Sequence, residues 1–337
     1  MAKPGPRNTI ADVGGLLVGC AEDAAVRTGV TVLLPEARAT AAVEVLGGGP
    51  GTRETDALAP QNLVDAVDAI VLSGGSVYGL GAADAVVAAL GARGRGYVLR
   101  QGAPAAPVVP AAILFDLGNG GDKSWGETPP YARLGRAALD AVSAEVPLGS
   151  RGAGYGAMAG QLQGGQGSAS AVTEDGFTVA ALAAVNCYGS ATAPGGRAFW
   201  AWALEQGGEF GSVGAPKGPL GDLEDWGGAK ADPAGRNSTT LCVAATDAVL
   251  SKAQAKRFAQ MAAAGLARAI RPVFAPFDGD VAFALATGAK ALPDPAALHL
   301  ARLGALAADC VARAVARGVY AAGRWPSAQT RVWRDLV

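Results

Sequence analysis

Short apolar runs alternate along this chain with alanine-rich stretches, and the period of each pattern predicts its secondary structure. Strands are predicted at 29–33, 40–46, 68–73, 168–173, 177–186, 239–246 and 280–286. The apolar run 107–115 leads into a turn at Asp116. The sequence Glu174-Asp175-Gly176 separates two of the strands, so these two are predicted to form a hairpin.

Three alanine-rich stretches predict helices, at 83–92, 251–270 and 294–317. In the second of them the larger apolar residues share one face with small ones: Phe258, Met261, Ala262, Gly265, Leu266 and Ile270. Strands alternating with helices are typical of an α/β fold, and by themselves they suit a doubly wound sheet equally well.

One long segment, 207–238, is rich in glycine, proline and charged residues and poor in apolar ones. A stretch of this length without secondary structure inside a compact domain is usually functional or disordered. It predicts a flexible linker that ends at an apolar strand. That strand starts with two threonines, Thr239 and Thr240.

Composition narrows the function classes. The 337 residues are 50% hydrophobic, and 28 basic residues nearly balance 29 acidic ones. A chain with this balance gives no reason to expect a nucleic-acid partner. The N-terminal stretch has no apolar core of a secretion signal, and no apolar run approaches the roughly 20 residues of a membrane helix. The four cysteines are far apart in sequence, which favours reduced thiols in a cytoplasmic protein.

The chain has a single histidine, His299, within a predicted helix. It therefore has almost no means of building a Ser-His-Asp triad, a Cys-His dyad or a multi-histidine metal site. A hydrolase with this composition needs a lysine, a carboxylate or a free α-amine as its base.

The junction Asn237-Ser238-Thr239 is where such chemistry could occur. The Thr239 hydroxyl could attack the Ser238 carbonyl, and water would then release the upstream chain. The freed α-amine has a reference pKa of about 7.7–8.0 and could serve as the base for the same hydroxyl. Spacing alone also permits an ordinary loop-to-strand boundary, because hydroxyl residues are common there.

Six blocks, in order, resemble one family. They are GGGPGTRETDAL (47–58), VDAIVLSGGSVYGLGAADAV (67–86), VPAAILFDL (109–117), GAGYGAMAG (152–160), STTLCVAATDA (238–248) and FDGDVAFALATG (277–288). The family is that of N-terminal-nucleophile peptidases, which includes DmpA-type aminopeptidases, β-peptidyl aminopeptidases and nylon-oligomer endohydrolases. The resemblance implies an αββα sandwich, as in ornithine acetyltransferase, that is cleaved by its own threonine. It also implies one hydrolase domain over 1–337, cut into a larger chain 1–238 and a smaller chain 239–337.

The resemblance also implies residue roles. Counting back from the strand residues places the nucleophile on Thr239, whereas counting from Asn237 would place it on Ser238. Asn186 matches the family's oxyanion-hole asparagine, and Asp278 and Asp280 match the acids that orient the nucleophile's amine. From local sequence alone, Asn186 would be interpreted as a turn residue, and Asp278 and Asp280 as part of a surface turn or a partial calcium loop.

Two positions depart from the nylon-oligomer hydrolases. Gln161 stands at their lysine and Phe115 at their active-site tyrosine, so the pocket is expected to have less positive charge and to favour neutral acyl groups. The LSGGSVYGL turn is expected near the site, with Ser76 and Tyr78 in the substrate pocket. The same turn also follows a strand and opens a helix, but it lacks both phosphate-loop patterns.

These features together predict an amide hydrolase that needs no cofactor and no metal. It would act on small amides or short peptides, and the resemblance implies a homo-oligomer, a tetramer of processed pairs. Two alternatives remain open at this stage: an acyl transferase like ornithine acetyltransferase, and a small-molecule-binding relative with little or no turnover.

Overall fold

The computed structural model describes every residue except 218–225, 227, 231–237 and 337. Its centre is a pair of stacked five-stranded sheets. The first has the strand order β1 (Leu16–Asp23), β2 (Thr28–Pro35), β5 (Ile70–Ser73), β6 (Ala111–Ile113) and β4 (Thr52–Arg53). The second has the order β3 (Thr40–Val45), β12 (Val281–Lys290), β11 (Thr239–Ala248), β10 (Thr178–Asn186) and β9 (Gln166–Val172).

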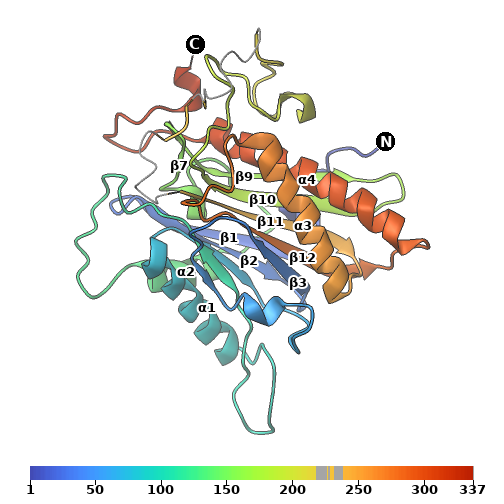
Figure 1. The fold of residues 1–337 in the computed structure, drawn as a ribbon. Coiled ribbons are helices and arrows are strands. Elements are labelled where there is room, and N and C mark those ends of the chain that lie inside the picture. Colours follow the sequence, from blue (N-terminus) through green and yellow to red (C-terminus); the bar gives the residue numbers. More distant parts are fainter. Residues whose placement is uncertain (218–225, 227, 231–237, 337) are drawn as a thin grey trace.

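Helices cover both outer faces of this pair (Figure 1). The first sheet packs against α1 (Gly81–Ala92) and α2 (Tyr131–Asp140), and the second against α3 (Lys252–Ala269) and α4 (Ala296–Ala321). The fold is therefore the αββα sandwich that the family resemblance implied. The doubly wound alternative is wrong, because the chain distributes its strands over two sheets rather than one.

Side-chain alternation in β11 explains how this strand connects the layers. Leu241 and Val243 face the first sheet, while Cys242 and Ala244 face α3 and α4. A strand that is apolar on both faces can only lie in the middle of a covered sheet. β11 accordingly lies between β10, which is antiparallel to it, and β12, which is parallel.

Most predicted elements are confirmed within a few residues. The hairpin at Glu174 is β9 and β10, and the predicted helical face of α3 is buried except for Met261, which is partly exposed. Sequence patterns missed β1 and α2, along with the short strands β4, β7 (Met158–Ala159) and β8 (Leu162–Gln163). Among the described residues, none of the helices is long and apolar enough to span a bilayer.

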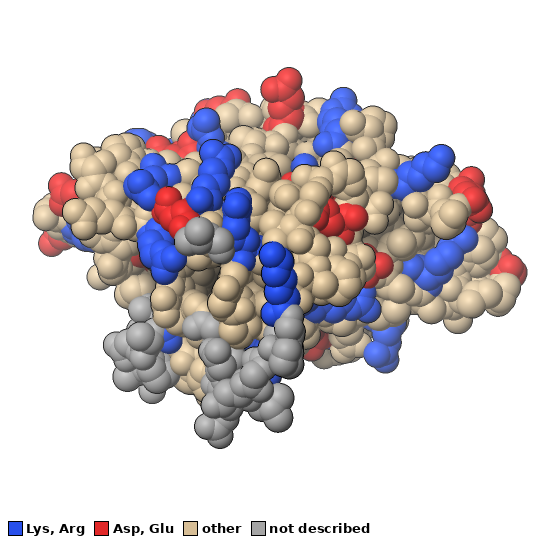
Figure 2. Space-filling view, turned by 90° about the horizontal axis from the view of Figure 1, so that it is seen from above, with Lys and Arg blue, Asp and Glu red and all other residues tan. Residues whose placement is uncertain are grey.

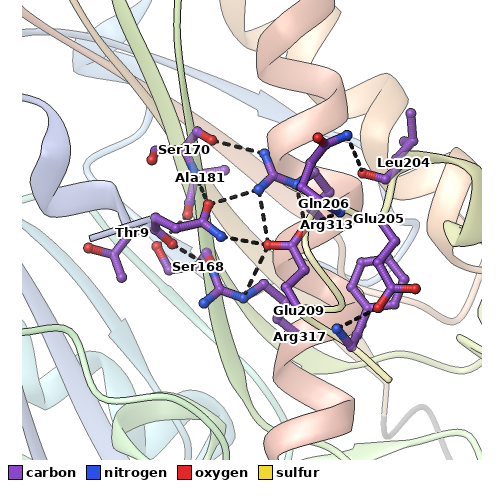
Figure 3. A network of polar contacts seen from close by, with 12 residues as sticks. Thr9, Ser168, Ser170, Ala181, Leu204, Glu205, Gln206, Glu209, Arg313 and Arg317 are labelled. Carbon is purple, nitrogen blue, oxygen red and sulfur yellow. Dashed lines mark hydrogen bonds and ion pairs between the residues drawn. The ribbon is translucent and has the colours of Figure 1, made fainter. Parts of the chain in front are cut away.

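The described parts of 207–238 are not the loose linker that composition predicted. Phe210 is buried, and the buried Glu209 carboxylate pairs with Arg313 of α4 at 2.6 Å and with Arg317 at 3.5 Å. Figure 3 shows Glu209 together with Arg313 and Arg317. Asn8, near the N-terminus, also donates to Glu209, at 2.6 Å. The predicted linker therefore starts with an anchor on α4. Its residues 218–225, 227 and 231–237 lie outside the described part of the chain.

Charge is distributed without a dominant sign. On the face seen from above, basic and acidic side chains are both scattered among uncharged ones (Figure 2). This agrees with the near-equal totals of basic and acidic residues in the sequence.

Candidate active site

Thr239 is the first residue of β11, at the centre of the second sheet. Its side chain and that of Ser238 are buried. The Thr239 hydroxyl donates a short hydrogen bond to the carbonyl oxygen of Ser238. The oxygen that would attack is thus beside the peptide group that would be cut, in contact with its carbonyl oxygen.

The loop before β12 contacts the same peptide group. Ser238 bridges to Asp278 in parallel fashion, and the Gly279 N–H donates to the Ser238 carbonyl oxygen at 3.1 Å. A Cβ at Gly279 would lie 2.4 Å from the Thr239 hydroxyl oxygen, so only glycine leaves room for this side chain. The Gly279 N–H is oriented to stabilise negative charge on the Ser238 oxygen.

Asp278 and Asp280 flank this glycine and are both buried. Asp280 accepts from the Thr240 N–H at 2.6 Å and from the Phe274 N–H at 3.0 Å, which fixes its carboxylate under the start of β11. Asp278 accepts from the Gly279 N–H at 3.0 Å. Burial raises the pKa of both carboxyl groups, and the charge of Asp278 raises the pKa of Asp280 further. The pair therefore carries fewer than two negative charges in the uncut chain, and a cation placed beside it would favour the ionised form.

Asn186 is the last residue of β10 and pairs directly with Thr239 across the ladder. Its side-chain carbonyl accepts from the Met158 N–H at 2.9 Å, and its amide N–H donates to the Phe115 carbonyl at 3.1 Å. These two bonds fix which side of the amide group is the donor. Asn186 also lines a cavity of about 200 Å³.

The cavity is lined by Phe115, Asp116, Met158, Asn186 and Lys230, together with Asn119 and three glycines. Asp116 is fully enclosed and accepts from the Thr28 hydroxyl at 2.6 Å and from the Gly75 N–H at 2.8 Å. Burial raises the pKa of Asp116 to about 6, so the group is largely ionised at neutral pH. One wall of the cavity thus carries a carboxylate.

The sequence predicted a pocket with less positive charge than that of the nylon-oligomer hydrolases, but the structure places another lysine, Lys230, at this cavity. Lys230 Nζ lies 3.0 Å from the Asn186 backbone carbonyl, 3.4 Å from its side-chain oxygen and 3.3 Å from the Ser238 hydroxyl. Sequence reasoning missed this residue because it belongs to the segment interpreted as a linker. No periodic pattern marks it, and its contacts depend entirely on the tertiary fold.

Of the four residues predicted to form the substrate pocket, only one lines the cavity that Asn186 and Lys230 line. Phe115 lines the cavity. Gln161 instead lines a neighbouring cavity of about 430 Å³ with Ser190, Thr192 and Arg331. Ser76 and Tyr78 line neither; Tyr78 is half-exposed and packs edge-on against Trp125. Their turn reaches the site only through Gly75, whose N–H holds Asp116.

The sequence did not indicate the Gly279 N–H or Lys230 as parts of the site, and it marked Asp116 only as a turn. Among the described residues, no group of three His, Cys, Asp or Glu side chains is arranged to hold a metal ion. The described residues bring together the Thr239 hydroxyl, the Ser238 carbonyl group that it contacts, two buried carboxyl groups and the amine of Lys230. This is chemistry suited to acyl transfer from an amide.

Known proteins share this architecture. An L-aminopeptidase D-Ala-esterase/amidase from Ochrobactrum anthropi, described as a variant of the Ntn hydrolase fold, superimposes with a TM-score of 0.72. It is 24% identical over 100% of this chain and 92% of its own. The chain thus has the fold of the Ntn hydrolases.

Sequence comparison then defines the family. The model of peptidase family S58 matches residues 8–332, and the chain belongs to that family. An uncharacterized aminopeptidase of Mycobacterium tuberculosis is 43% identical over 98% of both chains. A 6-aminohexanoate-oligomer endohydrolase of Kocuria sp. is 30% identical over 84% of this chain and 76% of its own. The protein is an enzyme, an amide hydrolase of the aminopeptidase type.

Proposed function

We propose that Thr239 is the nucleophile of this hydrolase and that the chain cuts itself between Ser238 and Thr239. One observation carries the proposal. The Thr239 hydroxyl and the Gly279 N–H both bond to the carbonyl oxygen of Ser238, so nucleophile and oxyanion donor meet on one peptide group. A structural boundary between loop and strand would need neither contact.

Self-cleavage then runs in two steps. The Thr239 oxygen bonds to the Ser238 carbonyl carbon, the C–N bond breaks, and an ester links the two parts while the Thr239 amine becomes free. Water hydrolyses the ester and leaves chains 1–238 and 239–337. Asp280 accepts from the neighbouring Thr240 N–H, and we assign Asp278 and Asp280 to hold the new ammonium and to orient it toward the hydroxyl.

Substrate hydrolysis repeats this chemistry on a foreign amide. The free α-amine takes the proton of the Thr239 hydroxyl, an acyl-threonine forms, and water releases the acid. Asn186, opposite Thr239 on β10, supplies an amide N–H to the oxyanion. This use of water sets the proposal apart from acyl transfer to an amine, and the aminopeptidase family favours it.

We infer that the substrates are small amides or short peptides with a free amine. A cavity of about 200 Å³ leaves room for a short acyl group, and Phe115 gives it an apolar wall. The Asp116 carboxylate in the same cavity favours an ammonium on the substrate. Related chains named aminopeptidase and 6-aminohexanoate-oligomer endohydrolase support both amino-acyl and aminoalkanoyl groups. The sequence predicted a preference for neutral acyl groups. Because Lys230 supplies a positive charge at the cavity, we expect acyl groups with a carboxylate to bind as well.

Two broader features belong to this proposal. All four cysteines are free thiols, which favours a reducing compartment such as the cytoplasm. The family resemblance favours a homo-oligomer of processed pairs. Neither feature changes the chemistry at Thr239.

Intact-mass analysis of the purified protein tests the proposal. Two chains are expected, and N-terminal sequencing of the smaller one should read Thr-Thr-Leu-Cys. Thr239→Ala should stay a single chain, and a start at Ser238 would move the nucleophile one residue back. A panel of amino-acyl anilides, with and without added acyl acceptors such as ornithine, then separates hydrolase from transferase. A single, inactive wild-type chain would instead favour a binding protein.

A further inference from the structure

The proposed self-cleavage raises a question about its base. In the uncut chain the nitrogen of Thr239 is part of a peptide bond, and an amide nitrogen cannot accept the hydroxyl proton. The α-amine that serves during substrate turnover therefore does not exist when the first bond is cut. Another group of the precursor has to take this proton.

Lys230 is the candidate, because its side chain reaches the residue before Thr239. Its Nζ is 3.3 Å from the side-chain oxygen of Ser238, the residue whose carbonyl is attacked. The two bonds to Asn186 hold the amine on the side of β10 that faces the start of β11. Lys230 thus reaches the residue at the scissile bond from a segment of the larger chain.

The backbone around Lys230 is docked onto the site rather than passing by it. The Lys230 N–H donates to the Tyr188 carbonyl at 2.9 Å, two residues beyond Asn186. The backbone N–H of Gln161 donates to Gly228 at 2.7 Å, and its side-chain amide donates to Ala229 at 3.2 Å. Gln161 therefore clamps the segment that carries the lysine.

Gly160 permits this close approach. It has a φ of +58°, and a Cβ added there would lie 2.1 Å from the Gly228 carbonyl oxygen. Gly160 is the last residue of the GAGYGAMAG block. A glycine is required there because the segment that carries Lys230 crosses directly over it. Three backbone or side-chain contacts and one steric requirement thus agree on the placement of Lys230.

Burial makes the neutral amine of Lys230 more accessible than that of an ordinary lysine. Burial lowers the pKa of Lys230 to about 8, while Cys187, Asp278 and Asp280 face it and act in the opposite direction. Burial raises the pKa of the Cys187 thiol, which stays protonated. An amine with a pKa near 8 provides a usable fraction of neutral base at neutral pH, whereas an ordinary lysine does not.

We propose that Lys230 is the base of self-cleavage, an inference that rests on Thr239 being the nucleophile. Neutral Nζ accepts the Thr239 hydroxyl proton as the oxygen bonds to the Ser238 carbonyl carbon. The resulting ammonium returns that proton to the Thr239 nitrogen as the C–N bond breaks. This leaves the ester, a free Thr239 amine and a neutral Lys230, so the step needs no other reactant.

The test is a time course of cleavage of the full-length precursor, made by cell-free translation and followed on gels from pH 6.5 to 9.5. Wild-type cleavage should speed up with pH, with a midpoint near 8. Lys230→Met should slow it at least ~100-fold, the usual contribution of a general base. Lys230→Arg should be as slow, because arginine keeps the positive charge but cannot release a proton.

Matched controls make the result specific. Lys256→Met removes a lysine of α3 that pairs with Glu44 on β3 and lines neither cavity at the site, so this variant should cleave like the wild type. Gln161→Leu should slow cleavage less than Lys230→Met does and retain the pH midpoint, since it only loosens the clamp. Circular dichroism and resistance to added protease establish that each uncut variant is folded.

The outcomes separate the two proposals. If Thr239→Ala is also cut at the same bond, the nucleophile is wrong and the role of Lys230 falls with it. If Thr239→Ala stays intact while Lys230→Arg cleaves at the wild-type rate, Thr239 stands and Lys230 is only a fixed cation. A wild-type rate that does not change with pH across this range would equally overturn the base assignment.

Discussion

Asn186 and Thr239 face each other across one rung of the central sheet, as the last residue of β10 and the first residue of β11. Backbone pairing, rather than any side-chain contact, sets the distance between the proposed oxyanion donor and the proposed nucleophile. Strand positions are more rigid than loop positions, so the pair is preorganised.

The first prediction concerns the donor. Asn186→Ala should lower kcat for amide hydrolysis by a factor on the order of 100–1,000, because one oxyanion donor is lost. It also frees the Met158 N–H, so the amount of processed protein has to be measured first. Steady-state kinetics on processed variant protein is the measurement, and a near-normal kcat would remove Asn186 from the oxyanion site.

Gly279→Ala should abolish most self-cleavage without unfolding the chain. The added methyl would lie 2.4 Å from the Thr239 hydroxyl oxygen and has to push that side chain away from Ser238. Displacement of a nucleophile by about 1 Å can cost about 100-fold in rate. Gly81→Ala is the matched control, because a Cβ at Gly81 meets no atom within 4 Å. Equal cleavage of the two variants would contradict the prediction.

Asp280→Asn should impair both cleavage and stability. Both carboxylate oxygens of Asp280 accept backbone N–H bonds, from Thr240 and Phe274, and an asparagine can accept only one of them. One buried N–H then lacks a partner, which costs about 1–3 kcal/mol. Denaturant unfolding of the variant in a Thr239→Ala background measures the stability, and loss of stability with unchanged cleavage would indicate a purely structural role.

Lys230 should lower the free energy of unfolding at neutral pH, because its burial disfavours the protonated form. Its pKa is about 8 in the folded chain and about 10.4 in a free lysine, so the unfolded state binds more protons between these values. Stability therefore rises with pH through this window, and the penalty is fully present below pH 8. In a Thr239→Ala background, Lys230→Met should change the pH 7 to pH 10 stability difference by about 2 kcal/mol, measured by denaturant unfolding. Parallel pH curves for the two proteins would contradict the shifted pKa.

Local patterns predicted the central elements well, for physical reasons. Strands 177–186 and 239–246 and helix 251–270 are apolar over most of their length, and a covered sheet and its helices impose that pattern. In contrast, sequence reasoning missed α2 although its buried residues recur at helical spacing, because the helix is only ten residues long and has Gly135 in its middle. The division of strands between two sheets came from the family resemblance, since no local pattern encodes it.

The candidate site divides in the same way. Thr239 and Asn186 lie at strand ends, Asp278 and Asp280 lie just before β12, and the structure brings these four residues together. Lys230 and the Gly279 N–H could not be predicted. A backbone donor has no side-chain signature, and Lys230 meets Asn186 only because Gly160 lets two distant segments cross.

Self-cleavage as proposed would change how the protein refolds, because Thr239 starts the central strand of a five-stranded sheet. The precursor forms its sheet within one chain, where β10 and β11 are tethered. Once the bond is cut, unfolding releases two separate polypeptides, and recovery becomes a bimolecular encounter that dilution slows. Glu209 and its two arginine partners add to the barrier against separation, since they lie on opposite sides of the cut. The mature enzyme would then persist through slow unfolding rather than through a reversible equilibrium, and denaturation would be a one-way event.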